Sequence, residues 1–334
     1  MNIRFYLKKQ GGGNKRIKGG NYMGINPPIK HNEERRSASC APAKKYNDTC
    51  YTKDTLTEMA LAYNKYITKM DGGEELIEVN EETTNKEIIK QLTNRLKKEC
   101  GKDQQCWKKQ DFIKLIPNKE IRTEIEKYTF RPKGPEGRFT WLSTTDIDDV
   151  NRQYEKKYEN YKFLGAVPMD FDDIPQYGIK NLNFDELYKN NKYKIGMIIN
   201  LDKHNQNGSH WVALYANIQT GEIYYFDSYG SEPYLPITYF VDRIAKWYMK
   251  KNYGMDIKAD GAYMRKNKKN NVEQMAGLTI KYGTMRHQYK SSECGVYSIN
   301  FILELLNGKT FDDINETKLL DDIVNQRREI YFTY

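Results

Sequence analysis

The sequence predicts an α+β fold in which a central mixed sheet is flanked by helices and preceded by a separate helical segment. Short apolar runs bounded by turn residues indicate buried strands over 195–199, 209–215 and 222–226. Helical spacing of apolar residues indicates amphipathic helices after these strands, over 236–251 and from Cys294 onward. The chain has 334 residues, which is enough for one large domain or two.

Residues 1–35 are predicted to form a basic, glycine-rich disordered tail with few apolar anchors. Residues 1–53 carry twelve Lys or Arg and three Asp or Glu, and 12 − 3 gives +9, the net charge of the whole chain. The basic charge therefore belongs to this segment, where it suits contact with nucleic acid or an acidic partner. The alternative interpretation is a solvated tail without a partner.

Residues 36–130 predict a compact helical arm domain without chemistry of its own. Its expected helices begin, in chain order, at Thr52 or Asp54, at Thr84 or Asn85, near Trp107 and at Lys119. The segment 131–137 is rich in proline and glycine and predicts a linker. The domain boundary is therefore expected there, with the catalytic domain over 131–334.

The second domain is expected to begin with a helix capped by Ser143 or Thr144 and running through Tyr158. The sheet is expected to begin near Lys194, and the tail from Asp312 is expected to be helical. Its predicted buried stripe consists of Leu319, Leu320, Ile323 and Val324. Between Pro168 and Pro175 lie the carboxylates Asp170, Asp172 and Asp173. A solvated loop is the favoured interpretation for them, and a metal cluster is the alternative.

Five cysteines are present: Cys40, Cys50, Cys100, Cys106 and Cys294. An odd number without a secretory signal suggests a reducing compartment and a protein that is not secreted. The first four are therefore expected to be packed or free thiols, with a zinc site across both pairs as the alternative. No apolar run approaches the roughly 18 residues of a membrane helix, so no membrane partner is expected.

Four residue types typical of a cysteine hydrolase occur in the second domain. Cys294 opens an apolar helix, where unpaired backbone N–H groups and the helix dipole favour a thiolate. Gln288 lies six residues earlier and carries an amide able to donate to an oxyanion. His210 begins one strand of a predicted hairpin, and Asp227 ends the other. The polar residues before Cys294 predict an exposed thiol, and Gly295 would allow a substrate backbone to approach closely.

The motifs that contain these residues resemble the clan of ubiquitin-like-protein (SUMO) proteases and the adenovirus protease. They are Trp141-Leu142, Gly208-Ser-His210-Trp211, Tyr225-Phe-Asp227-Ser228 and Gln288-x5-Cys294-Gly295, within about residues 139–305. The resemblance implies a papain-like cysteine protease core with Cys294 as nucleophile, His210 as base, Asp227 as orienting carboxylate and Gln288 as oxyanion donor. It implies no cofactor.

The resemblance is strongest to the core-polyprotein processing proteases of large nucleocytoplasmic DNA viruses, of the asfarvirus type. It implies cleavage after Gly-Gly in viral structural polyproteins during virion maturation, in the host cytoplasm and the virion. Trp211 resembles the wall of a narrow glycine tunnel, and Trp141 and Gly295 are further substrate-binding candidates. The sequence Lys18-Gly19-Gly20-Asn21 resembles such a cleavage site, so self-cleavage is a hypothesis and flexible linker glycines are the alternative.

Three other functions remain open at this level. Removal of a ubiquitin-like modifier uses the same Gly-Gly chemistry on a folded conjugate. Acetyl transfer occurs in the same clan with a similar Cys/His centre, and an inactive binding module would need none of the four residues. The presence of both Asp227 and Gln288 favours hydrolysis over the last two.

Overall fold

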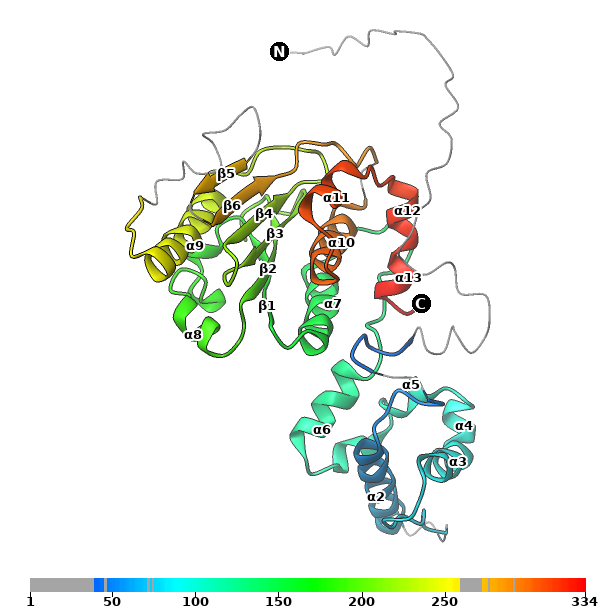
Figure 1. Ribbon diagram of the computed structural model, residues 1–334. Coiled ribbons are helices and arrows are strands. Elements are labelled where there is room, and N and C mark those ends of the chain that lie inside the picture. The colour runs from blue at the N-terminus through cyan, green and yellow to red at the C-terminus, as the bar shows by residue number, and fades with distance from the viewer. Residues whose placement is uncertain are drawn as a thin grey trace, which may run out of the picture.

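The computed structural model describes residues 39–44, 47–70, 73, 75–258, 272–275, 277–290 and 292–334. The predicted tail over 1–35, with its Gly-Gly sequence, lies outside the described residues. Figure 1 shows a sheet with helices on both sides, and a smaller group of helices beside it built from the first third of the chain. The arrangement confirms the predicted α+β class with a mixed central sheet and a helical N-terminal region.

The sheet has six strands in the order β1-β2-β3-β4-β6-β5. Pairing is parallel for β1–β2 and β4–β6, and antiparallel for β2–β3, β3–β4 and β5–β6. The strands are β1 (Tyr161–Pro168), β2 (Lys194–Asn200), β3 (Trp211–Asn217), β4 (Glu222–Phe226), β5 (Val272–Met275) and β6 (Leu278–Tyr282). The predicted hairpin is confirmed as β3 and β4, where Ala213 pairs with Phe226.

The prediction that the sheet begins near Lys194 is wrong, because β1 precedes it. The sequence of β1 did not indicate a strand, because it contains Gly165 and Pro168, and both residue types are uncommon inside strands. Gly165 has φ of +126° at a register shift between Phe163 and Ala166, so the strand contains a bulge. Proline is tolerated at the end of an edge strand, where one side of the backbone has no partner strand.

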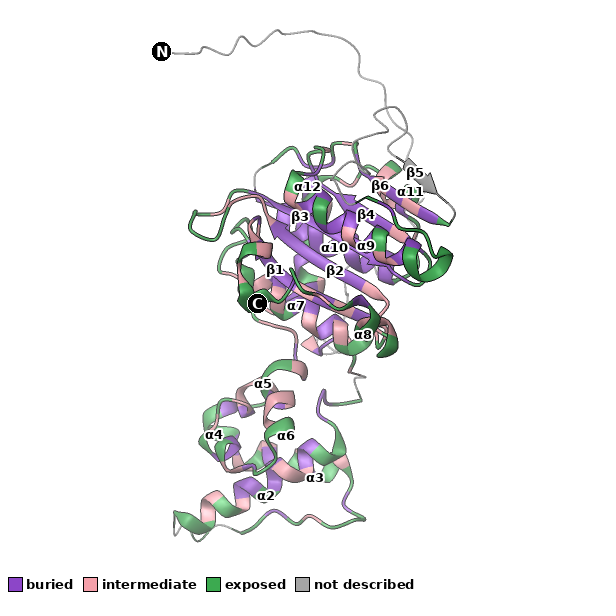
Figure 2. Ribbon diagram, turned by 90° about the vertical axis from the view of Figure 1, so that its left-hand side faces the viewer, coloured by how far each residue is buried: buried purple, intermediate pink, exposed green. Residues whose placement is uncertain are grey.

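Two helical layers cover the sheet (Figure 1). One layer contains α8 (Phe184–Lys189) and α9 (Leu235–Tyr253), and the other contains α7 (Thr144–Lys157) and α10 (Cys294–Leu306). The strand β3 is buried on both faces: Trp211, Ala213 and Tyr215 pack in the α7/α10 core, while Val212, Leu214 and Ala216 pack in the α8/α9 core. Figure 2 shows the resulting band of buried residues along the strands.

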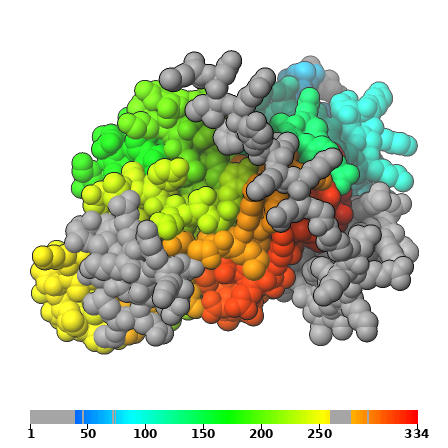
Figure 3. Space-filling model, turned by 90° about the horizontal axis from the view of Figure 1, so that it is seen from above, coloured from blue at the N-terminus to red at the C-terminus, as the bar shows by residue number. Residues whose placement is uncertain are grey.

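The helix α10 is buried at every one of its thirteen positions, from Cys294 to Leu306. It packs between the sheet and a C-terminal group of short helices, α11 (Phe311–Glu316), α12 (Asp321–Gln326) and α13 (Arg328–Tyr331). The predicted helical tail is thus three helices, and Leu320 is 49% exposed rather than buried, because it lies just before α12. Figure 3 shows this C-terminal third, in orange and red, forming one surface with the middle of the chain.

The N-terminal helices have a core of their own, which includes Leu56, Ile88, Trp107 and Phe112. They are α2 (Lys53–Lys69), α3 (Asn85–Arg95), α4 (Lys97–Cys100), α5 (Gln104–Trp107), η1 (Asp111–Leu115), α6 (Lys119–Thr123) and η2 (Glu124–Tyr128). Thr52 and Thr84 cap α2 and α3 as predicted, since each hydroxyl accepts from a backbone N–H of the first turn. Ser143 likewise caps α7.

Four of the five cysteines are paired, which contradicts the predicted free or packed thiols. Disulfides join Cys40 to Cys50 and Cys100 to Cys106, and only Cys294 is free. The sequence separations of 10 and 6 residues gave no hint, because the pairing depends on how the arm folds around them. The prediction of a reducing compartment, made from the odd number of cysteines and the lack of a secretory signal, is not supported by these two disulfides, because disulfides persist mainly in oxidising environments.

The acidic loop after β1 is tied down by ion pairs. Asp170 pairs with His204 at 2.6 Å, and Asp172 receives two hydrogen bonds from Arg243, at 2.7 and 2.9 Å. Among the described residues, no group of three or more His, Cys, Asp or Glu side chains is arranged to hold a metal ion. Within the same residues, no helix has both the length and the apolar character needed to cross a membrane.

Candidate active site

The predicted histidine and carboxylate meet at one end of the β3–β4 hairpin. His210 immediately precedes β3 and Asp227 immediately follows β4, so the antiparallel pairing brings the two together. The distance from His210 Nε2 to Asp227 Oδ1 is 2.6 Å, and Asp227 is 1% exposed. The same Oδ1 accepts the backbone N–H of Tyr229 at 2.8 Å. The carboxylate is therefore fixed, and it orients the imidazole ring.

The other side of the imidazole faces Cys294 at the start of α10. Cys294 lies close enough to His210 to affect its pKa, and since Nε2 contacts Asp227, Nδ1 is left for the sulfur. Burial alone would lower the pKa of His210, but the hydrogen bonds and charges of Asp227 and Cys294 raise it to about 9. The site therefore favours an imidazolium beside the sulfur, the condition for a reactive thiolate.

The helix start holds Cys294 against the sheet. Ser298, one turn along α10, donates from its hydroxyl to the backbone carbonyl of Trp211 at 3.2 Å. This bond ties α10 to the first residue of β3, next to His210. Cys294 is only 2% exposed, so the predicted exposed thiol is wrong: the residue belongs to the core shared by Leu142, Trp211 and α10.

The ring of Tyr229 covers one face of the imidazole. Its centroid lies 4.5 Å from that of His210, with 18° between the planes. The guanidinium carbon of Arg286 lies 5.4 Å from the centre of the Tyr229 ring and 4.8 Å from that of the Tyr289 ring. Aromatic stacking restricts the tilt of the imidazole. Tyr229 was not among the site residues predicted from the sequence, although it lies only two residues after Asp227.

Gln288 is completely buried, and its amide orientation is fixed. The Ser228 hydroxyl donates to Gln288 Oε1 at 2.7 Å, and Gln288 Nε2 donates to the Lys290 carbonyl at 2.6 Å. The backbone N–H groups of His287 and Gln288 both donate to the Ser228 carbonyl, at 2.8 and 2.9 Å. The loop that carries Gln288 is thus attached to the residue after Asp227. An amide NH2 has two N–H groups, so one remains after the bond to Lys290.

The substrate-binding candidates Trp211 and Gly295 meet at Leu142. The Trp211 indole Nε1 donates to the Leu142 carbonyl at 3.0 Å, and Trp211 is 6% exposed. A Cβ atom at residue 295 would lie 3.1 Å from the Leu142 Cβ, so the glycine is needed for this packing. The neighbouring Trp141 is 44% exposed and free to contact another molecule. The structure shows Gly295 packed against Leu142, and its contact with a substrate backbone stays a prediction.

A buried ion pair next to the nucleophile candidate was also missed. Glu293, just before Cys294, pairs with Arg328 of α13 at 3.0 Å, and both side chains are 2% exposed. The residues lie 35 positions apart, so no local pattern could have revealed the pair.

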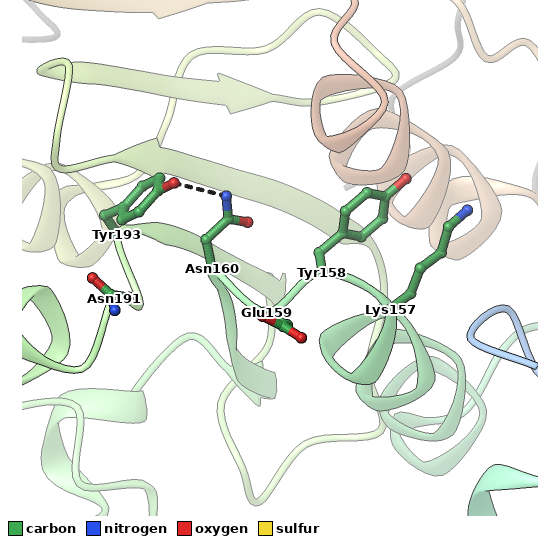
Figure 4. A pocket seen from close by; sticks show the side chains of 6 residues that line it. All are labelled: Lys157, Tyr158, Glu159, Asn160, Asn191 and Tyr193. Carbon is green, nitrogen blue, oxygen red and sulfur yellow. Dashed lines mark hydrogen bonds between the residues drawn. The ribbon is translucent and has the colours of Figure 1, made fainter.

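An open pocket lies elsewhere, between the end of α7 and the start of β2 (Figure 4). Six residues line it: Lys157, Tyr158, Glu159, Asn160, Asn191 and Tyr193. It is located where β1 and β2 begin, whereas His210 lies next to the end of β2, because Trp211 pairs with Asn200. The pocket and the candidate active site therefore lie at opposite ends of strand β2.

Comparison with known proteins agrees with this geometry. Residues 189–333 match the model of the Ulp1 protease family, C-terminal catalytic domain. A thiol protease of Acanthamoeba polyphaga mimivirus is 36% identical over 304 residues, covering 88% of this chain and 92% of the relative. A SUMO-1 cysteine protease of African swine fever virus is 22% identical over 259 residues, covering 71% of this chain and 86% of the relative.

A crystal structure of the African swine fever virus protease has the same fold. It matches with a TM-score of 0.55 at 19% identity, over 88% of this chain and 95% of that one. Together with the buried Cys–His–Asp arrangement, these matches identify a cysteine peptidase, an enzyme that acts on protein substrates. More narrowly, the chain belongs to the Ulp1 protease family, and the two relatives described above are viral.

Proposed function

We propose that Cys294, His210, Asp227 and Gln288 form the catalytic centre of a cysteine endopeptidase. The observation that carries the proposal is the buried 2.6 Å contact between the His210 imidazole and the Asp227 carboxylate, with Cys294 close enough to the same imidazole to raise its pKa. A thiol at a helix N-terminus beside an imidazolium is the activated nucleophile of this class of enzyme.

In the proposed reaction the Cys294 sulfur attacks the carbonyl carbon of the scissile bond, and His210 holds the thiol proton. The oxyanion is held by the Gln288 amide and by the Cys294 N–H, which has no acceptor within α10 because it opens the helix. His210 then gives its proton to the leaving amine as the C–N bond breaks. Water, deprotonated by His210, releases the acyl group and restores the thiol.

For the substrate, we propose viral structural or core polyproteins cleaved after Gly-Gly during virion maturation, in the host cytoplasm and the virion. The viral origin of the relatives supports a viral protein as the substrate. Trp211 and Trp141 are proposed to bind the segment before the cut, where a side chain larger than glycine would meet the indole wall. The helical arm over 36–130, which has its own core, and the basic tail over 1–35 are proposed to bind the substrate or an acidic partner such as nucleic acid.

Removal of a ubiquitin-like modifier is the second candidate function. It is favoured by the family description and by the name of the African swine fever virus relative. A folded modifier ending in Gly-Gly presents the same extended tail as a polyprotein, so both substrates suit the same catalytic centre.

A fluorogenic peptide ending in Gly-Gly before the reporter tests the proposal, with the Cys294→Ala variant and an Ala-Ala peptide as controls. Turnover of only the Gly-Gly peptide, lost in Cys294→Ala, is the expected result. Turnover that survives in Cys294→Ala would refute the nucleophile, and equal turnover of both peptides would refute the specificity. Cleavage of a folded SUMO conjugate without cleavage of the short peptide would favour the second candidate function.

A further inference from the structure

Glu293, the residue before Cys294, is held by the C-terminal end of the chain. Arg328 Nε lies 3.0 Å from Glu293 Oε2, and Asn325 Nδ2 donates to Glu293 Oε1 at 3.0 Å. Burial of both charges costs free energy that the pairing only partly recovers, so such a pair is weak evidence for a stabilising role. The pairing does fix the position of the Glu293 side chain, which is held by both Arg328 and Asn325.

Arg328 also fixes the backbone around Glu293. Its Nη2 donates to the Thr140 carbonyl at 2.8 Å and to the Ser292 carbonyl at 3.4 Å. The Glu293 carbonyl accepts from the N–H of Tyr297, the fourth residue of α10, at 2.9 Å. One guanidinium therefore contacts the residues from which α10 starts, and this start determines where the Cys294 N–H points.

The same C-terminal segment supports the loop of Gln288. Asp321, the first residue of α12, accepts the backbone N–H groups of Tyr289 at 2.9 Å and Lys290 at 3.3 Å. Lys290 in turn supplies the carbonyl that accepts from Gln288 Nε2 at 2.6 Å. The position of the Gln288 amide is thereby linked to α12.

We propose that Asp321, Asn325 and Arg328 form a support that positions both oxyanion donors. Arg328 acts through Glu293 on the Cys294 N–H, and Asp321 acts through Lys290 on the Gln288 amide. This inference rests on the proposed function, since it assigns the support to the oxyanion site of that mechanism. Arg328 and Asp321 are positioning residues that do not touch the substrate.

The chain contains a matched control for Arg328. Its neighbour Arg327 pairs with Glu304, near the opposite end of α10, at 2.6 Å. Arg327→Met and Arg328→Met each remove one cation from a largely buried carboxylate on or next to the same helix, and only the second change lies beside Cys294. Glu304 keeps Lys309 as a second cation at 2.6 Å, so the further variant Arg327→Met/Lys309→Met, which removes both cations, shows whether loss of the whole charge pair lowers kcat.

Two reagents separate the oxyanion site from the thiol itself. A peptide aldehyde ending in Gly-Gly adds to the Cys294 sulfur and forms a hemithioacetal, whose oxygen occupies the oxyanion site. Iodoacetamide alkylates the sulfur with loss of iodide and forms no oxyanion. Cys294 is the one free cysteine, because the other four are in disulfides, so alkylation reports on this thiol alone.

For Arg328→Met we expect kcat on the Gly-Gly peptide to fall at least about tenfold, since loss of one oxyanion donor costs roughly 100- to 1,000-fold. The KM should change little, aldehyde binding should weaken about tenfold, and the alkylation rate should stay within about twofold. The milder variant Asp321→Asn, which keeps the side-chain shape, should show the same pattern to a smaller extent. Arg327→Met should lower the thermal midpoint and keep kcat.

Unchanged kcat and aldehyde binding in folded Arg328→Met would overturn the proposal, as would an equal loss of kcat in Arg327→Met. An equal loss of the alkylation rate and of aldehyde binding would show that the variant disrupts the Cys294–His210 pair itself. That result would also overturn the proposal. If the wild-type enzyme neither cleaves the peptide nor binds the aldehyde, the proposed function itself fails. Cleavage by the wild type with no effect of Arg328→Met refutes only the support.

Discussion

The two buried histidines of the catalytic part show how neighbours decide charge. His210 touches a carboxylate and a thiol, and its pKa is raised to about 9 despite its burial. His287 is 1% exposed, lies between Phe226 and Tyr297, and its pKa is lowered to about 4 by burial and by the charge of Lys318. At neutral pH the first is therefore an imidazolium and the second a neutral ring.

Asp227→Asn should move the pH dependence of activity. The Asp227 hydrogen bond and charge offset the effect of burial, so their loss lowers the pKa of His210 from about 9 and moves the alkaline decline of kcat/KM to lower pH. A fall of kcat of roughly 100- to 10,000-fold is expected from the loss of the orienting carboxylate. The measurement is kcat/KM from pH 5 to about 10.

A matched control is Asp170→Asn, which breaks the His204–Asp170 pair. That pair has the same 2.6 Å separation but an exposed histidine outside the catalytic centre. The control should keep the wild-type profile. An unchanged alkaline decline in Asp227→Asn would contradict the assigned role of Asp227.

His287 should make folding sensitive to acid. Its folded pKa lies below the ordinary value of 6.5, so between about pH 4 and 6.5 the unfolded chain binds more protons and stability falls with decreasing pH. The contribution is fully present above pH 6.5, amounts to roughly 1–3 kcal/mol, and is lost as the pH falls through about 4. His287→Gln should flatten this dependence in urea unfolding at pH 4.5 and 7. If the free energy of unfolding depended on pH as steeply in His287→Gln as in the wild type, His287 would not be the cause. The same flattening in the exposed-site control His204→Gln would also exclude a specific effect of His287.

Among the elements, those with a local signal were predictable. The caps Thr52, Thr84 and Ser143 were expected because a hydroxyl before a helical pattern satisfies free N–H groups. The hairpin carrying His210 and Asp227 was expected because apolar runs flank a Thr-Gly turn. The contact between these two residues follows from the hairpin, so this half of the site could be found from sequence.

The features that were predicted wrongly depend on partner residues that lie far along the chain. The strand β1 contains a bulge at Gly165 and gains its order from pairing with β2, more than thirty residues later. Cys294 was expected to be exposed because its preceding neighbours are polar, yet Glu293 is neutralised by Arg328 and buried with it. The polarity of a residue does not predict exposure when its partner lies far along the chain.

Gly295→Ala tests the packing of the α10 start on the segment before α7. The added Cβ would lie 3.1 Å from the Leu142 Cβ, a contact tight enough that Leu142 must shift by a few tenths of an ångström, so a loss of about 1–3 kcal/mol in the free energy of unfolding is expected. Leu142→Gly in the same chain removes the Leu142 Cβ and with it the close contact. The double variant should therefore lose less stability than the sum of the single variants in urea unfolding. Additive losses would show that the two residues do not compete for space.

At the scale of the whole molecule, one segment joins the arm to the catalytic part. Pro132 and Gly134 exchange backbone hydrogen bonds with Thr333 near the C-terminus. On the arm side, Arg131 Nε donates to the Cys40 carbonyl at 3.2 Å. The backbone of Cys40 forms an isolated antiparallel β-bridge with that of Phe130. The Cys40–Cys50 disulfide therefore lies where the arm meets the linker, while Cys294 belongs to the separate core around α10.

Loss of the Cys40–Cys50 disulfide should weaken the arm and spare the chemistry. A loop of about ten residues is closed by this bond, and opening it is expected to cost roughly 2–3 kcal/mol through the entropy of the unfolded chain. In Cys40→Ser/Cys50→Ser the thermal unfolding of the arm should shift to lower temperature. Turnover of a short Gly-Gly peptide, which needs only the catalytic part, should stay within about twofold.

The double variant Cys100→Ser/Cys106→Ser provides the comparison, because it opens the other disulfide of the arm, whose half-cystines lie 6 residues apart and pack beside Gln110. It should destabilise the arm without changing the linker contacts of Cys40. If either variant lost peptide turnover as severely as Cys294→Ala does, the arm and the catalytic part would have to fold as one cooperative unit. Retained peptide turnover with reduced cleavage of a long protein substrate would instead locate the function of the arm in substrate binding.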